Sequence, residues 1–439
     1  MNMNTKTTSS MDDTIAGELA TTGKRFTRTE RSWILYDVGN SAFVLLITSI
    51  LPIYFNNLAK QAGLAPSTYL AYWSYGTSVC TAIVALMGPI LGSIADQSGG
   101  KKRIFLSSVI FGLLCMLGMI IPTGWLSFLI VFMLAKIGFQ ASLIFYDAML
   151  TDITVSDRMD RVSTSGYAFG YIGSCVPFVL SLGVVLGTDL LGISAKQGIN
   201  LAIIINAIWW AAFTIPLLRR YKQIHYVERT GDGAAEVFRR LGHTLKELVR
   251  HKAAFYFLIA FVLYIDGVYT IIDLAASYGE SIGIEAQELL IALLLTQVIA
   301  FPATLVFGKL SKRFKNTTLI QVSIVGYALI ALFAIQLDRA WEFYFLALCV
   351  GLFQGGIQAL SRSYFGQIIP PERSGEYFSL YDICGKGASI IGTAIVGVIS
   401  QVTGRQNVAI STLVVLFVAG LIVLRMAIRQ GGAAGRSFQ

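Results

Sequence analysis

Long apolar runs constrain this chain more than any other feature of its sequence. A run of about 18 apolar residues or more is typical of a membrane helix, because about 20 residues at a rise of about 1.5 Å each cross the hydrocarbon core of a bilayer. Twelve such runs lie at roughly 33–58, 71–95, 104–121, 126–150, 162–187, 198–218, 253–279, 286–308, 316–336, 341–364, 377–401 and 407–428. With 13% charged residues and a mean hydropathy of +0.67, the chain does not have the composition of a soluble enzyme. We therefore expect an all-α membrane protein with twelve transmembrane helices.

The net charge of +9 is unevenly distributed along the chain. Lys and Arg gather in alternate loops, at 101–103, 158–161, 219–252, 309–315, 362–386 and in the tail after 425. This is the positive-inside pattern, and it predicts that both termini are cytoplasmic. We interpret the basicity as a sign of topology in a lipid bilayer, and no nucleic-acid partner is expected. Residues 1–32 lack the apolar segment of a signal peptide and are expected to form a disordered cytoplasmic tail.

No pattern typical of catalysis or metal binding is found in the sequence. The five cysteines are scattered without CxxC spacing, and the three histidines, at 225, 243 and 251, all lie in the central loop. Neither HExxH, GxSxG nor a phosphate-binding loop occurs. The expectation is a protein that is not an enzyme, with no cofactor and no metal.

The two halves of the chain resemble each other. Gly92 and Gly308 lie 216 residues apart, each before a short basic turn, and Gly170 and Gly385 lie 215 apart near the start of the fifth and eleventh runs. Six plus six helices with a parallel repeat and a long middle loop is the layout of a major facilitator transporter. We expect two pseudo-symmetric six-helix bundles, at 33–218 and 253–428, joined by a linker at 219–252 and followed by a cytoplasmic tail at 429–439.

The linker contains apolar residues at helical spacing surrounded by basic ones: Val237, Phe238, Leu241, Leu245 and Leu248. Two interpretations are open. The segment is either a basic amphipathic helix on the cytoplasmic membrane surface or an ordinary linker helix packed on the ends of the bundles.

Polar residues inside the apolar runs follow helical stripes in the first, fourth, seventh and tenth runs. An ionisable residue within a bilayer is costly and usually faces a cavity or a partner. At about 100° per residue, the side chains in each run lie on one face. The candidate substrate-binding residues are Asp37, Asn40, Ser41, Lys136, Gln140, Asp266, Thr270, Gln354 and Gln358.

Two roles are open for Lys136, which either contacts substrate or forms a structural ion pair with Asp266 or Asp37. Because no histidine lies in an apolar run, proton coupling would have to use carboxylates. Burial raises the pKa of a carboxyl group toward neutral, so Asp266 is the first candidate, followed by Asp37 and Asp273. Asp273 lies nearer a helix end, where capping is an alternative role.

The loop "GSIADQSGGKKR" at 92–103 resembles the signature of the major facilitator superfamily between its second and third helices. Gly92, Asp96, Gly100, Lys101 and Arg103 match it, with one extra residue in the loop. The resemblance implies that Asp96 helps to close the cytoplasmic gate against the eleventh helix. Arg103, and Arg161 at the start of the fifth run, complete the expected gating set. Lys312 stands where Asp96 would align in the second half.

Two longer segments, 33–55 and 351–389, resemble the vacuole-effluxer-like branch of this superfamily, which includes fungal autophagy-related vacuolar amino-acid effluxers and bacterial members. Tyr36, Asp37, Asn40 and Ser41 match its first-helix pattern, and the resemblance runs from about 31 to 428. Where the branch commonly has Trp-Ala, this chain has the dipeptide Val-Gly at 38–39, and these smaller residues would widen the pocket.

The expected function is secondary active transport of a small polar solute by alternating access, with proton-coupled amino-acid efflux favoured. A monomer in a bacterial cytoplasmic membrane is expected, with protons or another ion as coupling partner. One alternative is an exporter of a larger amphipathic compound such as a siderophore, drug or lipid-like molecule, which aromatic residues near the cavity helices would suit: Tyr36, Tyr54, Tyr146, Tyr264 and Tyr269. Another is a receptor on a transporter scaffold that does not itself transport.

Overall fold

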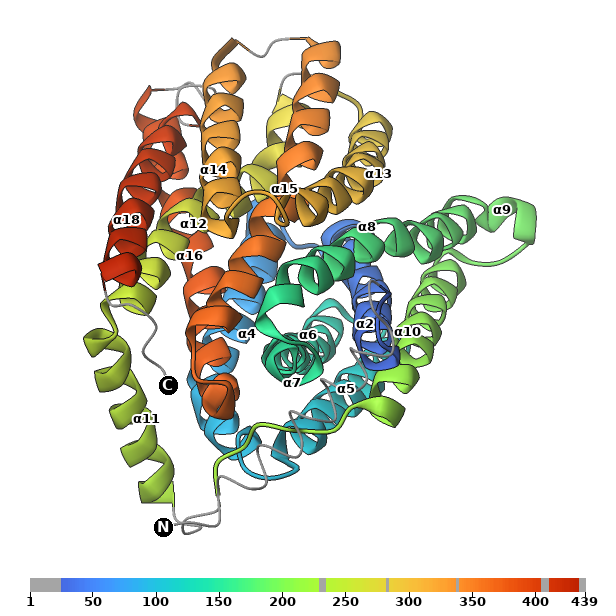
Figure 1. Cartoon of the computed structure of the whole chain (residues 1–439). Coiled ribbons are helices and arrows are strands. Elements are labelled where there is room, and N and C mark those ends of the chain that lie inside the picture. Colours follow the sequence, from blue (N-terminus) through green and yellow to red (C-terminus); the bar gives the residue numbers. More distant parts are fainter. Residues whose placement is uncertain (1–24, 229–233, 282–283, 337–338, 404–409, 434–439) are drawn as a thin grey trace. The chain divides into compact units, whose positions relative to one another are not determined.

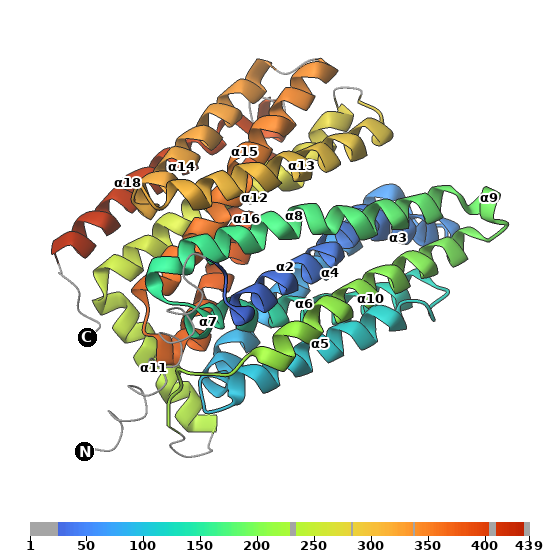
Figure 2. The same ribbon diagram turned by 45° about the vertical axis from the view of Figure 1, so that its right-hand side comes forward.

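The computed structural model describes residues 25–228, 234–281, 284–336, 339–403 and 410–433. These residues form helices joined by turns, with one isolated bridge between Gln97 and Val227. Figures 1 and 2 show the helices from two directions. Of the N-terminal segment 1–32 that was expected to be disordered, residues 1–24 lie outside the described part, whereas residues 28–32 are helical. Residues 434–439 of the expected C-terminal tail also lie outside the described part.

The chain divides into two compact units. Unit 1 comprises 1–155, 169–237 and 371–378. Its described helices are α2 (Arg28–Leu45), the π-helical turn η1 (Leu46–Ile50), α3 (Leu51–Gln61), α4 (Pro66–Ala95), α5 (Gly100–Gly118), α6 (Trp125–Ala148), α7 (Leu150–Ile153), α8 (Ser156–Leu186) from Phe169 onward, α9 (Thr188–Leu191), α10 (Ala195–Arg220) and η3 (Pro371–Arg373).

Unit 2 comprises 156–168, 238–370 and 379–439. Its described helices are the first turns of α8, most of α11 (Ala234–Arg250), α12 (Lys252–Ser281), α13 (Ala286–Leu310), α14 (Asn316–Phe333), η2 (Ala334–Gln336), α15 (Ala340–Ile368), α16 (Ser374–Thr403) from Ser379 onward and α18 (Leu413–Ala433). Two helices are therefore shared, because the start of α8 packs with unit 2 and the start of α16 packs with unit 1.

Ten helices of the described chain are long and apolar enough to cross a membrane: Arg28–Gln61, Thr68–Ala95, Trp125–Ile153, Ser156–Leu186, Ala195–Arg220, Lys252–Ile272, Glu288–Leu310, Asn316–Gln336, Trp341–Ile368 and Leu413–Gln430. The third and eleventh apolar runs are helical too, as α5 and α16, but are not among the ten. A basic Lys-Lys-Arg sequence lies in the first turn of α5, and Asp382 and Lys386 lie within α16. The described residues thus contain ten candidate membrane spans, and the count of twelve stays a prediction.

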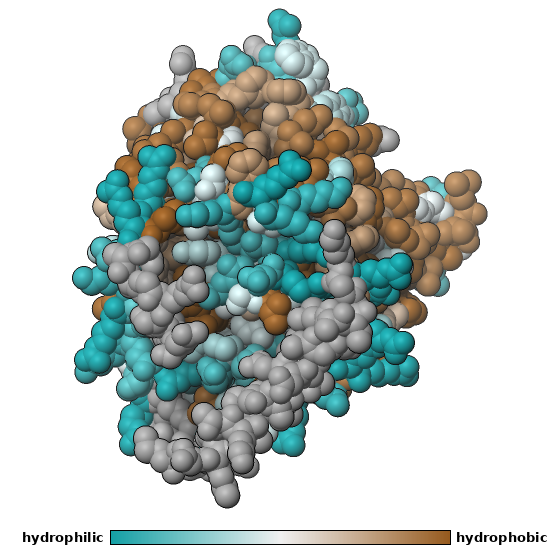
Figure 3. Space-filling view, viewed as in Figure 1, coloured by the Kyte–Doolittle hydropathy of each residue, from teal (hydrophilic) through white to brown (hydrophobic). Residues whose placement is uncertain are grey.

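Large apolar side chains cover much of the outside of these helices, as the brown areas of Figure 3 show. Lipid-facing helices expose such side chains because the surrounding solvent is itself apolar. Examples that are more than half exposed are Leu86, Leu114, Ile208, Leu329 and Val415.

Helix α2, which carries the first polar stripe, is fixed at both ends. It begins with a capping box in which Thr27 and Glu30 exchange side-chain and backbone hydrogen bonds, and Thr154 donates to the same glutamate at 2.7 Å. At its other end the helix passes into the π turn Leu46–Ile50. A π turn takes one more residue than an α turn, so the residues after it rotate relative to those before it.

Helix α11 lies within the segment expected to be the linker. Leu248 and Thr244 are buried and Val249 is exposed, so the end of α11 packs on protein along one side. The side chains of Val237, Phe238, Leu241 and Leu245 are outside the described part, which leaves both interpretations of the linker open for the start of the helix.

Candidate functional site

In unit 1 the polar residues of α2 lie where this helix meets α8. Asp37 and Asn40 are 6% and 3% exposed, and Ser41 is half-buried. The Nδ2 atom of Asn40 donates to the Tyr36 carbonyl at 3.1 Å and to Oδ1 of Asp37 at 3.2 Å. A buried carboxylate without such donors would be strongly unfavourable, so the amide makes its position tolerable. A Cβ atom on Gly170 of α8 would come within 2.7 Å of the Ser41 hydroxyl and 3.2 Å of the Asp37 carbonyl, which explains a glycine at that position.

Aromatic contacts fix the other face of α2 against α6. Trp33 stacks on Tyr146 with ring centroids 4.3 Å apart and donates its indole N–H to the Tyr146 carbonyl at 2.9 Å. The Tyr36 hydroxyl lies 2.8 Å from that of Ser142. These contacts bury Tyr36 and Tyr146 completely. Two of the tyrosines expected to suit a large amphipathic solute are thus part of the helix packing, and Tyr264 of unit 2 is buried in the same way, 2.6 Å from the Ser361 hydroxyl.

Helix α6 carries the two other candidates of unit 1. Lys136 is half-buried and lies close enough to Cys80 of α4 to act on it electrostatically. Gln140 is 7% exposed, and its Oε1 accepts no hydrogen bond from any described residue. A buried amide oxygen without a partner costs about 1–3 kcal/mol, so this oxygen is available to a donor on a ligand.

The dipeptide that departs from the family pattern faces neighbouring helices. A Cβ on Gly39 would lie 2.8 Å from Cβ of Phe213, and a Cβ on Gly173 would lie 2.5 Å from Cγ1 of Val38. The Val38 carbonyl also accepts from the indole N–H of Trp209 at 3.1 Å. The expectation that these two residues widen a pocket is therefore wrong, because both are used in the packing of α2 against α8 and α10.

In unit 2 an acid and a hydroxyl one turn apart on α12 face a glycine of α16. Asp266 and Thr270 are 1% and 0% exposed. Oδ1 of Asp266 accepts the Gly392 N–H at 2.9 Å and the Thr270 hydroxyl at 3.4 Å. A Cβ on Gly392 would come within 2.7 Å of that oxygen and closer still to the threonine hydroxyl, so any larger residue would displace them.

The two units contain related arrangements. On α2 and on α12 an acid is followed four residues later by a hydroxyl, and this face meets a glycine of α8 or of α16. The glycine in unit 1 faces the backbone carbonyl of Asp37, whereas the glycine in unit 2 faces the carboxyl group of Asp266. The sequence offset pairs Gly170 with Gly385, but the contact in unit 2 is made by Gly392, two turns later. A Cβ on Gly385 would instead lie 3.2 Å from the ring of Phe261.

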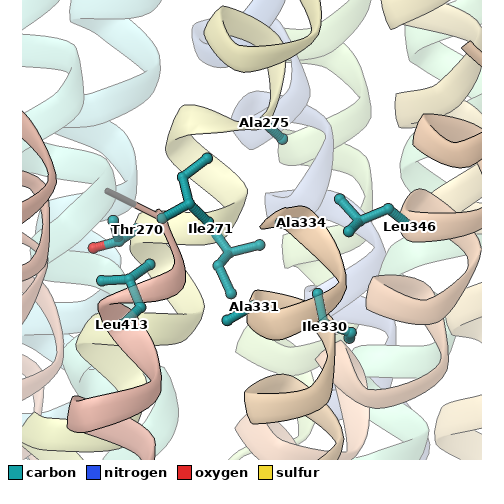
Figure 4. A pocket seen from close by; sticks show the side chains of 9 residues that line it. Thr270, Ile271, Ala275, Ile330, Ala331, Ala334, Leu346 and Leu413 are labelled. Atoms are coloured by element: carbon teal, nitrogen blue, oxygen red, sulfur yellow. The ribbon is translucent and has the colours of Figure 1, made fainter. Parts of the chain in front are cut away.

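The other candidates of unit 2 are distributed around this acid. Gln354 is buried and Gln358 half-buried, both on α15. The side chain of Asp273 is outside the described part of the structure. Figure 4 shows a small apolar pocket around Ile271, Ile330 and Leu346, with Thr270 at its edge. Its lining is otherwise hydrocarbon, so by itself it offers nothing to hold a charged solute.

Sequence reasoning missed Gln297 of α13, because only the four polar stripes were considered. This residue is 8% exposed, and its Oε1 also accepts no hydrogen bond from the described residues. An isolated amide in the apolar run at 286–308 was the available signal.

The loop expected to form a gate contacts the start of α16. Oδ1 and Oδ2 of Asp96 accept the backbone N–H groups of Gly375 and Glu376 at 2.7 and 2.9 Å. These are among the first N–H groups of a helix, which have no partner within the helix, and the carboxyl supplies one. We call this contact the α16 latch. Burial raises the pKa of Asp96 to about 7, opposed by Lys101 and the two N–H groups, whereas Glu376 raises it further.

Of the basic residues in this loop, the buried one is Lys101 rather than Arg103, which is exposed. The Lys101 ammonium lies 2.9 Å from Oδ2 of Asp152, which belongs to the short helix α7. The same carboxylate accepts the Tyr221 hydroxyl at 2.6 Å and the His225 backbone N–H at 2.8 Å. Asp152, absent from the expected gating set, thus ties the start of the linker to unit 1.

Arg161, the remaining member of the expected gating set, is half-buried in the first turns of α8. Among the described residues, no cluster of three or more His, Cys, Asp or Glu side chains fits a metal ion.

Relatives of known family match almost the entire chain. A family model described as "Vacuole effluxer Atg22 like" matches residues 27–434. The MFS-type transporter YxiO of Bacillus subtilis (strain 168) is 40% identical over 406 residues, which cover 91% of this chain and 95% of YxiO. Autophagy-related protein 22-1 of Aspergillus niger is 29% identical over 301 residues, covering 62% of this chain and 48% of that protein.

Solved structures agree on the fold. The fucose transporter FucP in its outward conformation has a TM-score of 0.67 at 14% identity, covering 91% of this chain and 97% of FucP. The human organic anion transporter MFSD10 has a TM-score of 0.66 at 13% identity, covering 90% and 99%. The chain therefore belongs to the Atg22-like vacuole effluxer family, and it is a membrane transporter of the major facilitator type.

Proposed function

We propose that this transporter is a proton-coupled exporter of amino acids or closely related zwitterions, working by alternating access. The observation that carries the proposal is a buried acid with a hydroxyl four residues later, repeated in the two units as Asp37 with Ser41 and Asp266 with Thr270. Buried carboxylates in membrane helices usually serve a transport pathway, because their cost would otherwise select against them. The effluxer description of the family supports the outward direction.

A zwitterion needs a cation for its carboxylate and an anion for its ammonium group. Lys136 is the cation of unit 1, and Asp37 and Asp266 are the anions of the two units. Hydrogen bonds to the solute would come from Asn40, Ser41, Gln140, Thr270, Gln354 and Gln358. The unpartnered oxygen of Gln140 supports this role, because a donor from the solute would remove the cost of its burial.

Proton coupling is assigned to the carboxyl groups, with Asp266 first and Asp37 and Asp273 after it. Gating is assigned to Asp96, Arg103 and Arg161. The remaining parts of the proposal are twelve spanning helices in two six-helix bundles, cytoplasmic termini, a monomeric state and location in a bacterial cytoplasmic membrane. The bacterial relative YxiO supports that location.

The test uses purified protein in tight liposomes and a panel of radiolabelled amino acids, with and without an imposed pH gradient. Gradient-driven accumulation of one or a few amino acids is expected. Asp266→Asn is expected to abolish the effect of the gradient while leaving exchange down a solute gradient, and Asp189→Asn, at an exposed aspartate, is the matched control. Lys136→Ala is expected to abolish binding of every accepted solute.

No accumulation of any amino acid in tight, protein-loaded vesicles would refute the substrate assignment. Lys136→Ala transporting all solutes at the original rate would refute the role of that cation.

A further inference from the structure

Another acid, outside the sites described above, lies half-buried at the start of α8 in unit 2. Oδ1 of Asp160 accepts hydrogen bonds from Nδ2 of Asn316 at 2.5 Å, from the Ser363 hydroxyl at 2.6 Å and from Nε2 of Gln367 at 3.0 Å. Asn316 is the first residue of α14, and the other two donors lie in the last turns of α15. One carboxyl oxygen thus connects three helices through uncharged donors.

Other contacts hold the same segment of α8. The Ser163 hydroxyl donates to the Ala359 carbonyl at 2.8 Å. Arg362, which is 2% exposed, donates to the hydroxyl and carbonyl oxygens of Ser163 at 2.9 and 3.1 Å, and its guanidinium lies 4.3 Å from the centre of the Tyr167 ring. The segment Ser156–Ala168 is therefore hydrogen-bonded to α15 along several turns.

This arrangement corresponds to the α16 latch of unit 1. The acid lies here in the first turns of a helix, whereas the acid of the α16 latch lies in the loop that follows α4. A Cβ on Gly375 would lie 2.8 Å from the Gly92 carbonyl, and a Cβ on Gly308 would touch the Thr164 hydroxyl. In both units the end of the second helix of a repeat thus meets the start of a fifth helix. In unit 1 the acid is in the loop, as Asp96; in unit 2 the loop has the exposed Lys312 instead.

We infer that Asp160 is the acid of a second latch, carried by the helix start instead of the loop, which holds the first turns of α8 and is released during the transport cycle. We call it the α8 latch. The inference rests on the proposed alternating-access mechanism. Helix α8 continues into unit 1 at Phe169. A rearrangement of the two units, which alternating access requires, must therefore strain or release the contacts of Asp160.

The test measures exposure of the first turns of α8 without using any substrate. Ser165 is 4% exposed, and Ser165→Cys nearly conserves its shape. In protein whose five native cysteines are replaced by alanine, the rate at which a water-soluble maleimide labels this thiol reports release of the segment. Asp160→Ala is expected to raise the rate about thirtyfold, since three hydrogen bonds to one carboxyl, each worth about threefold, are lost. Asp157→Ala, at an exposed aspartate one turn earlier, is expected to leave the rate unchanged.

Because Asp160→Ala leaves three donors without a partner, it can also prevent folding. Gln367→Ala removes a single donor and is expected to raise the labelling rate about threefold in protein that stays monodisperse. Unchanged labelling in both Asp160→Ala and Gln367→Ala overturns the inference, as does an equal rise in Asp157→Ala. Faster labelling in a protein that transports no amino acid would retain the α8 latch and refute only the proposed substrate.

Discussion

The α16 latch allows a graded prediction at Asp96. This carboxyl uses both oxygens to accept N–H groups at the start of α16, at 2.7 and 2.9 Å. Replacing an acid that caps a helix by alanine costs about 0.5–2 kcal/mol, so Asp96→Ala should shift the equilibrium between latched and released α16 by about 2- to 30-fold. Asp96→Asn keeps one acceptor oxygen and should cost about half as much free energy, which corresponds to a shift of about 2- to 5-fold.

Release can be followed by labelling of a cysteine beside the latch. Ser93, in the last turn of α4, is 1% exposed, and Ser93→Cys in the cysteine-free protein places a thiol one residue from Gly92. Labelling rates should rise in the order original protein, Asp96→Asn, Asp96→Ala. Gln97→Ala changes the adjacent side chain and should have no effect. Equal rates in all four proteins would refute the assignment of the latch to the Asp96 carboxyl.

The same assay should depend on pH, with Asp96 as the titrating group. Its pKa is about 7 when buried in the latch, under the influence of Lys101 and Glu376, and near 3.9 when released into water. Protonation of Asp96 therefore stabilises the latched state relative to the released state. This stabilisation is fully present below the pKa of the released carboxyl and is lost as the pH rises through about 7. The labelling rate of Ser93→Cys, divided by that of a free thiol with the same maleimide at the same pH, should thus increase from pH 5 to pH 8, and this increase should be absent in Asp96→Asn.

Two further predictions concern stability, measured by unfolding of the purified protein. Gly138→Ala should lower the free energy of unfolding by about 1–3 kcal/mol, because the new Cβ would lie 2.6 Å from the backbone nitrogen of Gly112 and neither backbone can rotate away. Gly183→Ala, where nothing lies within 4 Å of the new Cβ, should leave this free energy unchanged. Equal losses in the two variants would contradict this reasoning. Lys101→Met should cost about 3–5 kcal/mol because it leaves the Asp152 carboxylate buried without its cation, and adding Asp152→Leu should recover part of that loss. A double variant no more stable than Lys101→Met alone would show that the linker contacts, and not the ion pair, dominate.

Much of the candidate site could be found from the sequence, because its signals are local. Hydropathy over about 20 residues identifies membrane helices, and helical periodicity places Asp37 with Ser41 and Asp266 with Thr270 on common faces. In these cases the information lies within a few turns of one helix. The contact of Asp96 with the eleventh apolar run was instead implied by the resemblance of its loop to the family signature, and the structure contains a hydrogen bond to the start of that helix.

The remaining features depend on which helices meet, and this only the tertiary structure decided. Val38 and its neighbouring glycine were expected in a pocket but lie against α8 and α10, because periodicity defines a face without naming what covers it. The π turn at Leu46–Ile50 changes the helical register after α2, and such an extra residue in one turn leaves no clear mark in the sequence. In the sequence, Asp160 is an acidic residue within the basic loop at 158–161, with nothing to mark it as a contact residue. Its partners lie 156 to 207 residues away along the chain, and only the packing of α8 against α14 and α15 brings them within hydrogen-bonding distance.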